Sequence, residues 1–542
     1  MPRLYKILLL VLAVFFPAHI YAQWSTDPSN NLIVGYGLNP ELASDGAGGC
    51  YITYEQNLGY PRRLVLERLN RYGYKPWGSS IRILGELPEQ WFAKITEDGR
   101  GGVLISYSDD SIAQIGGTFR IRVQRVDSSG NLLWGSTGVR VSLSETNQDE
   151  QAIVSDRQGG CIVAWRDTLN MIKVQRIVNN GVRAWGDSGV IVEINTQYLP
   201  RLIQTEMDKF IVAYGASLRK LDIDGNMLWG GQAVNVGFGT RSVIADNDGG
   251  VIVYDGTGSS SNILIVAQRI DSSGVFVWKN PYVVLDDSSI FNVQGNPVAI
   301  NVDGGATFVW VKRVGNFNRA YTQRVRSDGS LAFSGGPIEV SAFDSAANGT
   351  WAIVTSGHDS KIYINADGRN NNSLYGQRID SSGNRLWNTN DNVISLRQLG
   401  YVDAITDAVG GFIVVGFDQS DFGIRTQQVS VNGNLGEIIL SVRESLFEIP
   451  QQLYLYQNFP NPFNPHTKIR FEIPERAHVL LNVYNLMGQE VATLVDGVKE
   501  PGRYEVIFSA EGGDASALST GIYFYRLNAG NYTSVRKLIL IK

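Results

Sequence analysis

Short runs of alternating hydrophobic and polar residues, separated by glycine and aspartate turns, extend through most of this chain. A clear example is Gly101-Gly102-Val-Leu-Ile-Ser-Tyr107, in which a glycine pair is followed by an apolar run that ends in an aromatic residue. Glycine pairs after aspartate favour turns with positive φ, and alternation with a period of two predicts a strand. Similar runs follow Gly159-Gly160, Gly249-Gly250, Gly304-Gly305 and Gly410-Gly411.

A second signature follows each of these runs: Gln-Arg, a short turn, a glycine, and a tryptophan four residues after the glycine. The first full copy is Gln124-Arg125, Gly130 and Trp134. The other copies are Glu67-Arg68/Gly73/Trp77, Gln175-Arg176/Gly181/Trp185, Arg219-Lys220/Gly225/Trp229, Gln268-Arg269/Gly274/Trp278, Gln323-Arg324/Gly329/Phe333, Gln377-Arg378/Gly383/Trp387 and Gln427-Gln428/Gly433/Glu437. A period of about 50 residues in strand-rich units predicts a radial or stacked repeat architecture.

Each unit is expected to contain four strands, which is the pattern of a β-propeller blade. Eight units predict eight blades over residues 23–440, and seven is the alternative because the unit at 198–236 is short and lacks its glycine pair. Gln23-Trp24 and Leu32-Ile-Val34 resemble a fourth strand without the preceding three. We therefore expect residues 23–36 to complete the last blade and remove a free sheet edge.

The repeated sequence pattern ends at about residue 440. Residues 441–454 are predicted to be a linker, and residues 455–542 contain about six short strands, which suggests a small immunoglobulin-like β-sandwich. The expected strands are 468–473, 479–484, 490–494, 504–508, 522–527 and 535–541. The fold class is therefore all-β: a propeller followed by a sandwich.

The C-terminal stretch resembles the type A sorting domain of the type IX secretion system of Bacteroidetes. The matching segments are Tyr456-Gln-Asn-Phe-Pro-Asn-Pro-Phe-Asn464, Val483-Tyr-Asn-Leu-Met-Gly-Gln-Glu-Val491, Gly521-Ile-Tyr-Phe-Tyr-Arg526 and Lys537-Leu-Ile-Leu-Ile-Lys542. The motif residues are Asn461, Pro462, Phe463, Gly488, Gly521, Tyr523 and Lys537. The resemblance implies passage across the outer membrane by the type IX machinery, which would be a partner. It leaves open whether the domain is then removed and whether the protein is anchored or released.

The N-terminus has the pattern of a secretory signal peptide, residues 1–22. Arg3 and Lys6 precede an apolar run from Ile7 to Phe16. Cleavage after Ala22 would leave Gln23 first. A run of about ten apolar residues is shorter than the ~20 that a spanning helix needs, so no transmembrane span is expected.

The composition limits which ligands and cofactors we expect this protein to bind. The net charge is −5 with scattered charges, which gives no electrostatic footprint for nucleic acid. Only four histidines occur, and Cys50 and Cys161 occupy equivalent places two units apart, so we expect free, buried thiols and neither a metal site nor a cofactor. Asp222-Ile-Asp-Gly-Asn226 lacks the downstream acidic ligand of a calcium loop and is interpreted as a turn.

The repeated residues are expected to be structural, because a residue present in nearly every unit is better explained by contacts between units than by one site. The hairpins are loosely similar to the tryptophan-docking repeats of quinoprotein dehydrogenases and the Asp-boxes of sialidases, whose catalytic sets are missing here. The tryptophans would pack between neighbouring units, and the aspartates would cap their own turns. This set comprises Arg125, Gly130, Trp134, Arg176, Trp185, Trp229, Arg269, Trp278, Arg378 and Trp387.

No catalytic residue emerges from the sequence. We expect a monomeric, non-enzymatic secreted or surface protein that binds a glycan or protein ligand. The alternative is a polysaccharide hydrolase or lyase. A third hypothesis is a structural spacer that binds no ligand. Irregular loops at 107–118, 256–262 and 369–373 offer the most room for a site. Two or three carboxylates with aromatic neighbours at the mouth of the propeller channel would favour the enzyme.

Overall fold

The computed structural model describes residues 24–541 with internal gaps. The gaps are 57–60, 88, 111–118, 260–261, 280, 288–290, 293–297, 301–303, 315–316, 341–346, 355–360, 368–372, 389–390, 408, 437–453, 459, 474–476, 500–501, 510–517 and 531. The chain divides into two compact units, Met1–Ile438 and Ile439–Lys542. Ala22 and Gln23, the expected cleavage site, lie outside the described residues, as does Glu437.

The first unit consists of successive antiparallel sheets, each formed by strands that follow one another in the sequence, and eight such sheets lie within the described residues. The first four sheets are β2 (Leu38–Ser44), β3 (Cys50–Gln56), β4 (Arg63–Leu69), β5 (Ile81–Ile83); β6 (Glu89–Glu97), β7 (Val103–Asp110), β8 (Phe119–Val126), β9 (Val139–Arg140); β10 (Gln148–Ser155), β11 (Cys161–Asp167), β12 (Ile172–Ile177), β13 (Val190–Glu193); and β14 (Arg201–Glu206), β15 (Lys209–Tyr214), β16 (Ser217–Asp222), β17 (Val234–Asn235).

The remaining sheets repeat this order. They are β18 (Ser242–Ala245), β19 (Val251–Ser259), β20 (Asn262–Ile270), β21 (Val283–Asp286); β22 (Phe291–Asn292) and β23 (Val298–Ile300), which both pair with β24 (Ala306–Val314), then β25 (Phe317–Val325), β26 (Ile338–Glu339); β27 (Ala347–Val354), β28 (Lys361–Asp367), β29 (Leu374–Ile379), β30 (Asn392–Ser395); and β31 (Leu399–Thr406), β32 (Phe412–Asp418), β33 (Gly423–Val429).

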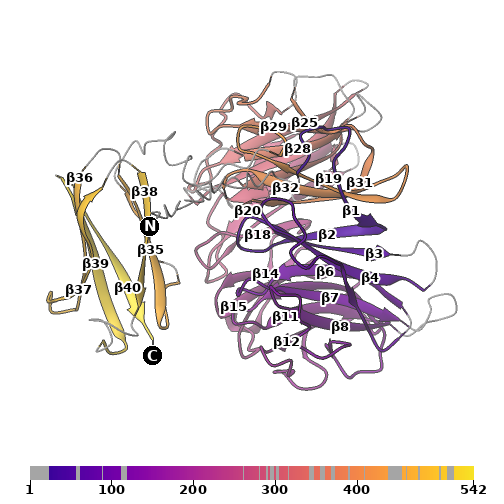
Figure 1. Ribbon diagram of the computed structural model, residues 1–542, viewed down its shortest axis with the longest axis horizontal. Coiled ribbons are helices and arrows are strands. Elements are labelled where there is room, and N and C mark those ends of the chain that lie inside the picture. The colour runs from indigo at the N-terminus through magenta and orange to yellow at the C-terminus, as the bar shows by residue number, and fades with distance from the viewer. Residues whose placement is uncertain are drawn as a thin grey trace, which may run out of the picture. The chain divides into compact units, whose positions relative to one another are not determined.

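The eighth sheet takes its fourth strand from the other end of the chain. Strand β1 (Leu32–Tyr36) pairs antiparallel with β33, with Leu32 opposite Thr426 and Tyr36 opposite Gly423. Figure 1 shows the indigo β1 beside the orange strands of the eighth sheet. This confirms the prediction that the N-terminal segment completes the last sheet.

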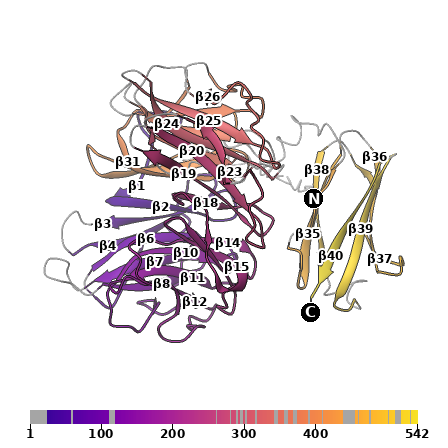
Figure 2. The same ribbon diagram turned by 180° about the vertical axis from the view of Figure 1, so that it is seen from behind.

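The first strands of the sheets contact one another in a closed cycle, because β2 touches both β6 and β31 and each remaining first strand touches the next. Figure 2 shows β14 and β18 between the purple and the red sheets. Apolar side chains fill the space between neighbouring sheets. Leu104 and Val123 of the second sheet, for example, pack against Cys161, Val163 and Trp165 of the third. The middle strands therefore have two buried faces, which explains their nearly continuous apolar runs.

The fourth strands of several sheets are short. Strand β9 covers only Val139–Arg140, and Trp134 lies before it, outside any strand. The reason is local: the Trp134 backbone N–H donates at 3.1 Å to the side-chain oxygen of Gln124 on β8, and not to a backbone carbonyl oxygen of that strand. Cys50 and Cys161 are free and buried, as expected.

The second unit is a two-sheet β-sandwich. One sheet has the order β34 (Tyr454–Leu455), β35 (His466–Ile473), β38 (Gly502–Ser509), and the other β37 (Glu490–Lys499), β36 (Ala477–Tyr484), β39 (Gly521–Ala529), β40 (Tyr532–Leu540). Both sheets contribute to one core, in which Phe471 meets Leu481 and Tyr525. The part of the chain that the structure describes contains no helix with the length and hydropathy needed to cross a membrane.

Candidate functional site

The two ends of the first strands in unit 1 carry different chemistry. Each first strand ends at the turn that leads to the second strand, for example at Asp45–Gly49 after β2. The hairpins between third and fourth strands lie at this same end, which we call the joint face. We call the opposite end, where the first strands begin, the bulge face.

On the joint face, the described turns between first and second strands place an acidic side chain beside a basic or amide side chain of the third strand, and Asp98 is an example that also binds its own turn. Asp98 accepts the N–H groups of Arg100 and Gly102 at 2.7 and 2.8 Å, and its other oxygen lies 2.7 Å from Arg125. A Cβ on Gly102 would come within 2.5 Å of the Val126 carbonyl oxygen, so only glycine fits there. The equivalent pairs are Arg68–Asp45, Arg176–Asp156, Arg269–Asp246, Lys220–Glu206 and Gln428–Asp407.

Six signature tryptophans of the described residues connect their sheets to the next one. The Trp134 indole N–H donates to the Asn179 carbonyl oxygen at 2.9 Å, and Gly181 of that neighbouring hairpin lies against its ring. A Cβ on Gly181 would come within 3.1 Å of the ring. The same bond joins Trp77 to Ser128, Trp185 to Ile223, Trp229 to Ser272, Trp278 to Ser327 and Trp387 to Val431. Gly130 stands against Trp77 in the same way, and Arg378 donates to Val431 at 3.2 Å.

The eighth joint is made by Trp24. Its indole N–H donates to the Arg71 carbonyl oxygen of the first sheet at 2.9 Å, and a Cβ on Gly73 would come within 3.0 Å of its backbone nitrogen. Gln427 donates to Ser25 O at 2.7 Å, just as Gln124 donates to the residue after Trp134 at 2.7 Å. The N-terminal segment therefore supplies both the missing strand and the missing tryptophan of the eighth repeat.

The hairpin aspartates cap their own turns. Asp127 accepts the N–H groups of Ser129 and Asn131, both at 2.9 Å. Burial acts to raise its pKa, but the hydrogen bonds from the side chain and backbone of Asn131 hold the pKa of Asp127 below its ordinary value. Asp222 forms the same turn with Asn226, in place of a calcium site. Across the described residues, no group of three histidine, cysteine or acidic side chains could hold a metal ion.

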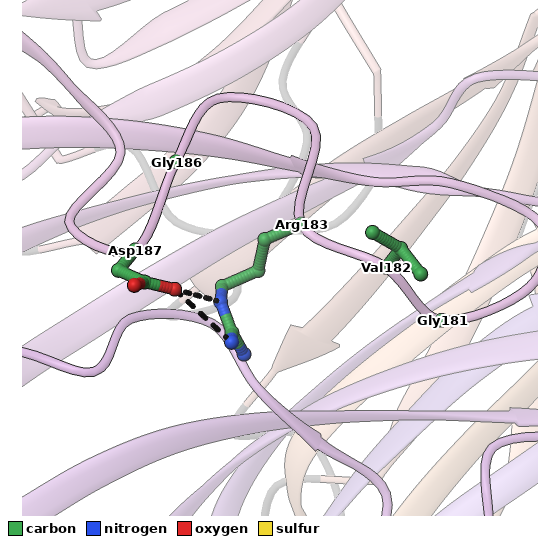
Figure 3. A pocket seen from close by; sticks show the side chains of 5 residues that line it. All are labelled: Gly181, Val182, Arg183, Gly186 and Asp187. Atoms are coloured by element: carbon green, nitrogen blue, oxygen red, sulfur yellow. Dashed lines mark hydrogen bonds and ion pairs between the residues drawn. The ribbon is translucent and has the colours of Figure 1, made fainter.

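A hollow of about 350 Å³ lies on the joint face at the hairpin of the third sheet. Gly181, Val182 and Gly186 line it together with Arg183 and Asp187, whose side chains Figure 3 shows in direct contact with one another. The Arg183 guanidinium lies 3.3 Å from Asp187 and also donates to the Arg140 carbonyl oxygen at 3.1 Å. Both charges have partners, so the hollow offers no reactive group.

The bulge face is built differently. Four neighbouring first strands (β31, β2, β6 and β10) each contain a bulge where the pairing skips two residues. At each bulge one residue other than glycine has a positive φ: Tyr401 (46°), Asn39 (49°), Phe92 (46°) and Glu150 (45°). A residue with a Cβ loses about 1–2 kcal/mol in this conformation, and such strain gathers at functional sites.

Two of the four bulge residues are exposed aromatics. Phe92 is 50 % exposed and Tyr401 is 71 % exposed. The backbone of Phe92 is held from both sides, because its N–H donates to Glu55 of the first sheet at 2.9 Å and its carbonyl accepts from Gln151 of the third. Its ring stacks on Trp91 with 4.3 Å between centroids. The Tyr401 ring lies 5.8 Å from Phe417. Neighbouring sheets thus hold the backbone of Phe92, and the Tyr401 ring packs against its own sheet, while both rings remain exposed.

Two residues beyond the bulge position, three of these strands (β2, β6 and β31) carry charged side chains. Glu41 of β2 forms an ion pair with Lys94 of β6. Burial, with a further contribution from Asp403, raises the pKa of Glu41 to about 7 against the opposing charge of Lys94. Asp403 of β31 accepts the Leu42 N–H at 2.9 Å and the Ala404 N–H at 2.8 Å. Burial raises the pKa of Asp403 as well.

Sequence reasoning did not identify this group. The side chains that it singled out in the first unit lie on the joint face. Of the loops that it favoured, residues 111–118 and 369–372 lie outside the described residues. The irregular loop expected at 256–262 is wrong, because residues 256–259 and 262 belong to the paired strands β19 and β20. Phe92, Tyr401, Glu41 and Asp403 have no common sequence motif. A usable signal was an aromatic or charged residue at the start of a first strand, but a bulge cannot be read from alternation alone.

In the second unit, the structure brings several motif residues together at the final strand. Asn461 accepts the Ile539 N–H at 2.8 Å and donates to the Lys537 carbonyl oxygen at 3.3 Å. Phe463 exchanges backbone hydrogen bonds with Ile539 and Ile541, and Pro462 lies between these contacts. Gly488 (φ 78°) turns the chain between β36 and β37, Gly521 begins β39, and Tyr523 is buried in the sandwich core.

Comparison with known proteins identifies only this second unit. Residues 457–542 match the family model described as the secretion system C-terminal sorting domain, which confirms the resemblance predicted from the motifs. A search of curated proteins finds no match.

Solved structures give weak likenesses to the chain. They include the BP39L lectin from Burkholderia pseudomallei (13 % identity, 74 % of this chain and 99 % of that chain covered, TM-score 0.34). The polysaccharide lyase Uly1 is similar at 10 % identity (77 % and 92 % covered, TM-score 0.38). PorZ, a surface component of the type IX secretion system of Porphyromonas gingivalis, is similar at 8 % (95 % and 100 % covered, TM-score 0.17). Scores this low carry no argument about function.

Proposed function

Because a type IX sorting domain at residues 457–542 makes this a secreted or cell-surface protein, we propose that its first unit is an eight-bladed β-propeller that binds an extracellular ligand on the bulge face. The eight sheets, the closed cycle of first strands and the closure by β1 support eight blades over seven. We propose the boundaries 1–22 for the signal peptide, with cleavage between Ala22 and Gln23, 23–440 for the propeller, 441–454 for the linker and 455–542 for an immunoglobulin-like sorting domain.

One observation carries the binding proposal: Phe92 and Tyr401 are exposed aromatics with a strained, positive-φ backbone at equivalent bulges, and neighbouring sheets hold the backbone of Phe92. Exposed rings of this kind stack on the apolar face of a sugar or of a peptide side chain, and rigid aromatic anchors lose little conformational entropy on binding. A glycan is the first ligand class to test, and a protein ligand is the second. On this account the protein acts as a monomer and has no cofactor.

The joint face serves the scaffold in this proposal. The arginines and tryptophans there bind turns of their own and of the next sheet, and the same contacts occur in sheet after sheet. We therefore assign structural roles to Arg125, Gly130, Trp134, Arg176, Trp185, Trp229, Arg269, Trp278, Arg378 and Trp387.

The experiment is a glycan and protein array probed with the secreted full-length protein. Phe92→Ala and Tyr401→Ala should each weaken binding at least tenfold. Tyr74→Ala removes an exposed tyrosine from a joint-face hairpin and is the matched control, which should bind like the wild type. Equal binding by all variants would refute the bulge-face site.

A second candidate function is hydrolysis or elimination on a polysaccharide. The raised pKa of Glu41, about 7, beside Asp403 is the pattern of a general acid next to a second carboxyl group. However, Glu41 is paired with Lys94, and both oxygens of Asp403 accept backbone N–H groups. These contacts favour binding over catalysis. Release of new reducing ends by the wild type but not by Glu41→Gln would reverse that preference.

A further inference from the structure

A second hollow opens on the bulge face between the fourth and fifth sheets. Its volume is about 550 Å³, within the range of roughly 300–1,000 Å³ that small-ligand sites occupy. Its walls come from the segment before β14, the turn between β15 and β16, and the segment before β18. These segments lie outside the sheets with the aromatic bulges, so the hollow is separate from the Phe92 and Tyr401 site.

The charged groups of this hollow do not balance. It is lined by two guanidinium groups, Arg201 and Arg241, and by one carboxylate, Asp255. Asp255 lies 3.5 Å from the Arg241 side chain and accepts the backbone N–H groups of Arg241 at 3.1 Å and Gly256 at 2.7 Å. In the part of the chain that the structure describes, no hydrogen bond or ion pair engages the Arg201 guanidinium. One positive charge therefore remains available in the hollow.

An aromatic ring lines the same hollow. Tyr198 is 62 % exposed and lies against Gly215, where a Cβ would come within 2.6 Å of the ring. Gly215 has a φ of 55°, and its carbonyl oxygen accepts both the N–H and the hydroxyl of Thr240, at 2.8 and 3.0 Å. The surface under the ring is thus tied to the neighbouring sheet, and the glycine lets the ring lie close to the backbone.

We propose that this hollow binds the carboxylate of an acidic polysaccharide, with Arg201 receiving a uronate carboxyl group and Tyr198 stacking on the sugar ring. A planar guanidinium donates two parallel hydrogen bonds to a carboxylate, which a neutral sugar cannot accept in the same way. An exposed aromatic ring in the same hollow as the cation favours a ring-shaped ligand over the open-chain carboxylate of a peptide C-terminus. A secreted or cell-surface protein also meets such polymers directly.

The test uses the full-length protein and calorimetric titration with polygalacturonate, alginate and hyaluronate. The neutral control is fully methyl-esterified polygalacturonate, which keeps the backbone but loses the charge. The wild type should bind at least one of the acidic polymers and not the ester. Arg201→Ala and Tyr198→Ala should each weaken that binding tenfold or more. The affinity of Arg201→Lys should lie between those of these variants and the wild type, because lysine keeps the positive charge but cannot donate two parallel hydrogen bonds to the carboxylate.

Arg183→Ala is the matched control, since it removes an arginine from the hollow on the joint face and should leave affinity unchanged. Thermal melting of each variant checks that it folds, and the exposure of Arg201 and Tyr198 predicts unchanged melting temperatures. Phe92→Ala should bind acidic polymers normally, so failure of the Phe92 and Tyr401 site can be told apart from failure of this one.

Three results would overturn the proposal: no binding to any of the acidic polymers, equal binding of the methyl ester, or unchanged affinity in Arg201→Ala. Stronger competition by a short peptide with a free C-terminal carboxylate than by oligogalacturonate would likewise replace the sugar with a peptide ligand.

Discussion

The two faces of the first unit differ in what is repeated. On the joint face, an acid, a basic or amide donor and a tryptophan meet in the same way from one sheet to the next, even where Lys220 or Gln428 replaces arginine. On the bulge face, equivalent positions carry Phe92, Tyr401, Asn39 and Glu150. Every sheet needs the same joint to its neighbour, whereas a ligand needs only some positions on one face. Departure from the repeat therefore indicates where to look for function.

Substitutions on the two faces are expected to differ in their effect on the free energy of unfolding. The turn aspartates Asp98 and Asp156 and the ring of Trp134 on the joint face are buried and have partners, so removing one of these contacts leaves a cavity or an unpaired charge. The aromatic rings of the bulge face are exposed, and their backbone is strained. Changes there should affect stability little and binding strongly.

The largest expected loss of stability follows Trp134→Ala. Its side chain is only 6 % exposed, so the substitution removes an indole from between two sheets together with its hydrogen bond to Asn179. We expect a loss of about 4 kcal/mol from the free energy of unfolding, in the range for buried tryptophan truncation. Urea denaturation measures it, with Tyr401→Ala as the control from the other face. A similar midpoint shift in both variants would contradict the division between faces.

The next effect concerns the ion pair on the same face. Arg125→Met should cost about 3 kcal/mol, because it leaves the Asp98 carboxylate buried without its cation. Arg125→Gln should cost about half as much. The eighth sheet supplies the reason, since Gln428 donates there to Asp407 at 3.0 Å and occupies the same place. The two variants are compared by urea denaturation. Equal losses of the free energy of unfolding would mean that the position of Arg125 requires a positive charge and not only a hydrogen-bond donor.

Much of the joint face could be predicted, and little of the bulge face. The repeat spacing indicated the sheets, the hairpin turns and the packing position of Trp134, because these depend on local turn chemistry that recurs. Closure by residues 23–36 was visible from an unmatched strand. Phe92 and Glu41 were missed, because their roles arise from bulges and from charges on neighbouring strands that are distant in sequence.

A smaller, pH-dependent effect is expected at Glu41. The folded-state pKa of about 7 lies above the ordinary value of 4.5, so the folded protein holds this proton more tightly than the unfolded chain does. Stability should therefore fall as pH rises from 4.5 to 7. Glu41→Gln removes this penalty, and its free energy of unfolding relative to the wild type should be about 2–3 kcal/mol more favourable at pH 8 than at pH 5. The same difference at both pH values would show that the carboxyl group is not perturbed.

The smallest stability effect is expected for Phe92→Gly. Glycine relieves about 1 kcal/mol of strain at φ 46° but loses the stack on Trp91, which contributes about as much. Stability should stay within about 0.5 kcal/mol of the wild type, and Phe92→Ala should be about 1 kcal/mol less stable than Phe92→Gly because it keeps the strain. Thermal or urea unfolding of the two variants decides this, and a more stable alanine variant would contradict a strained bulge.

The most direct test of the division between faces is to measure ligand binding and unfolding in the same set of full-length variants. The array ligand bound most strongly by the wild type is titrated against Phe92→Ala and Tyr401→Ala on the bulge face and Tyr74→Ala on the joint face. The account predicts at least tenfold weaker binding with little change in the unfolding midpoint for the first two, and unchanged binding for the third. Loss of binding only in Tyr74→Ala, or in all three alike, would contradict a ligand site on the bulge face.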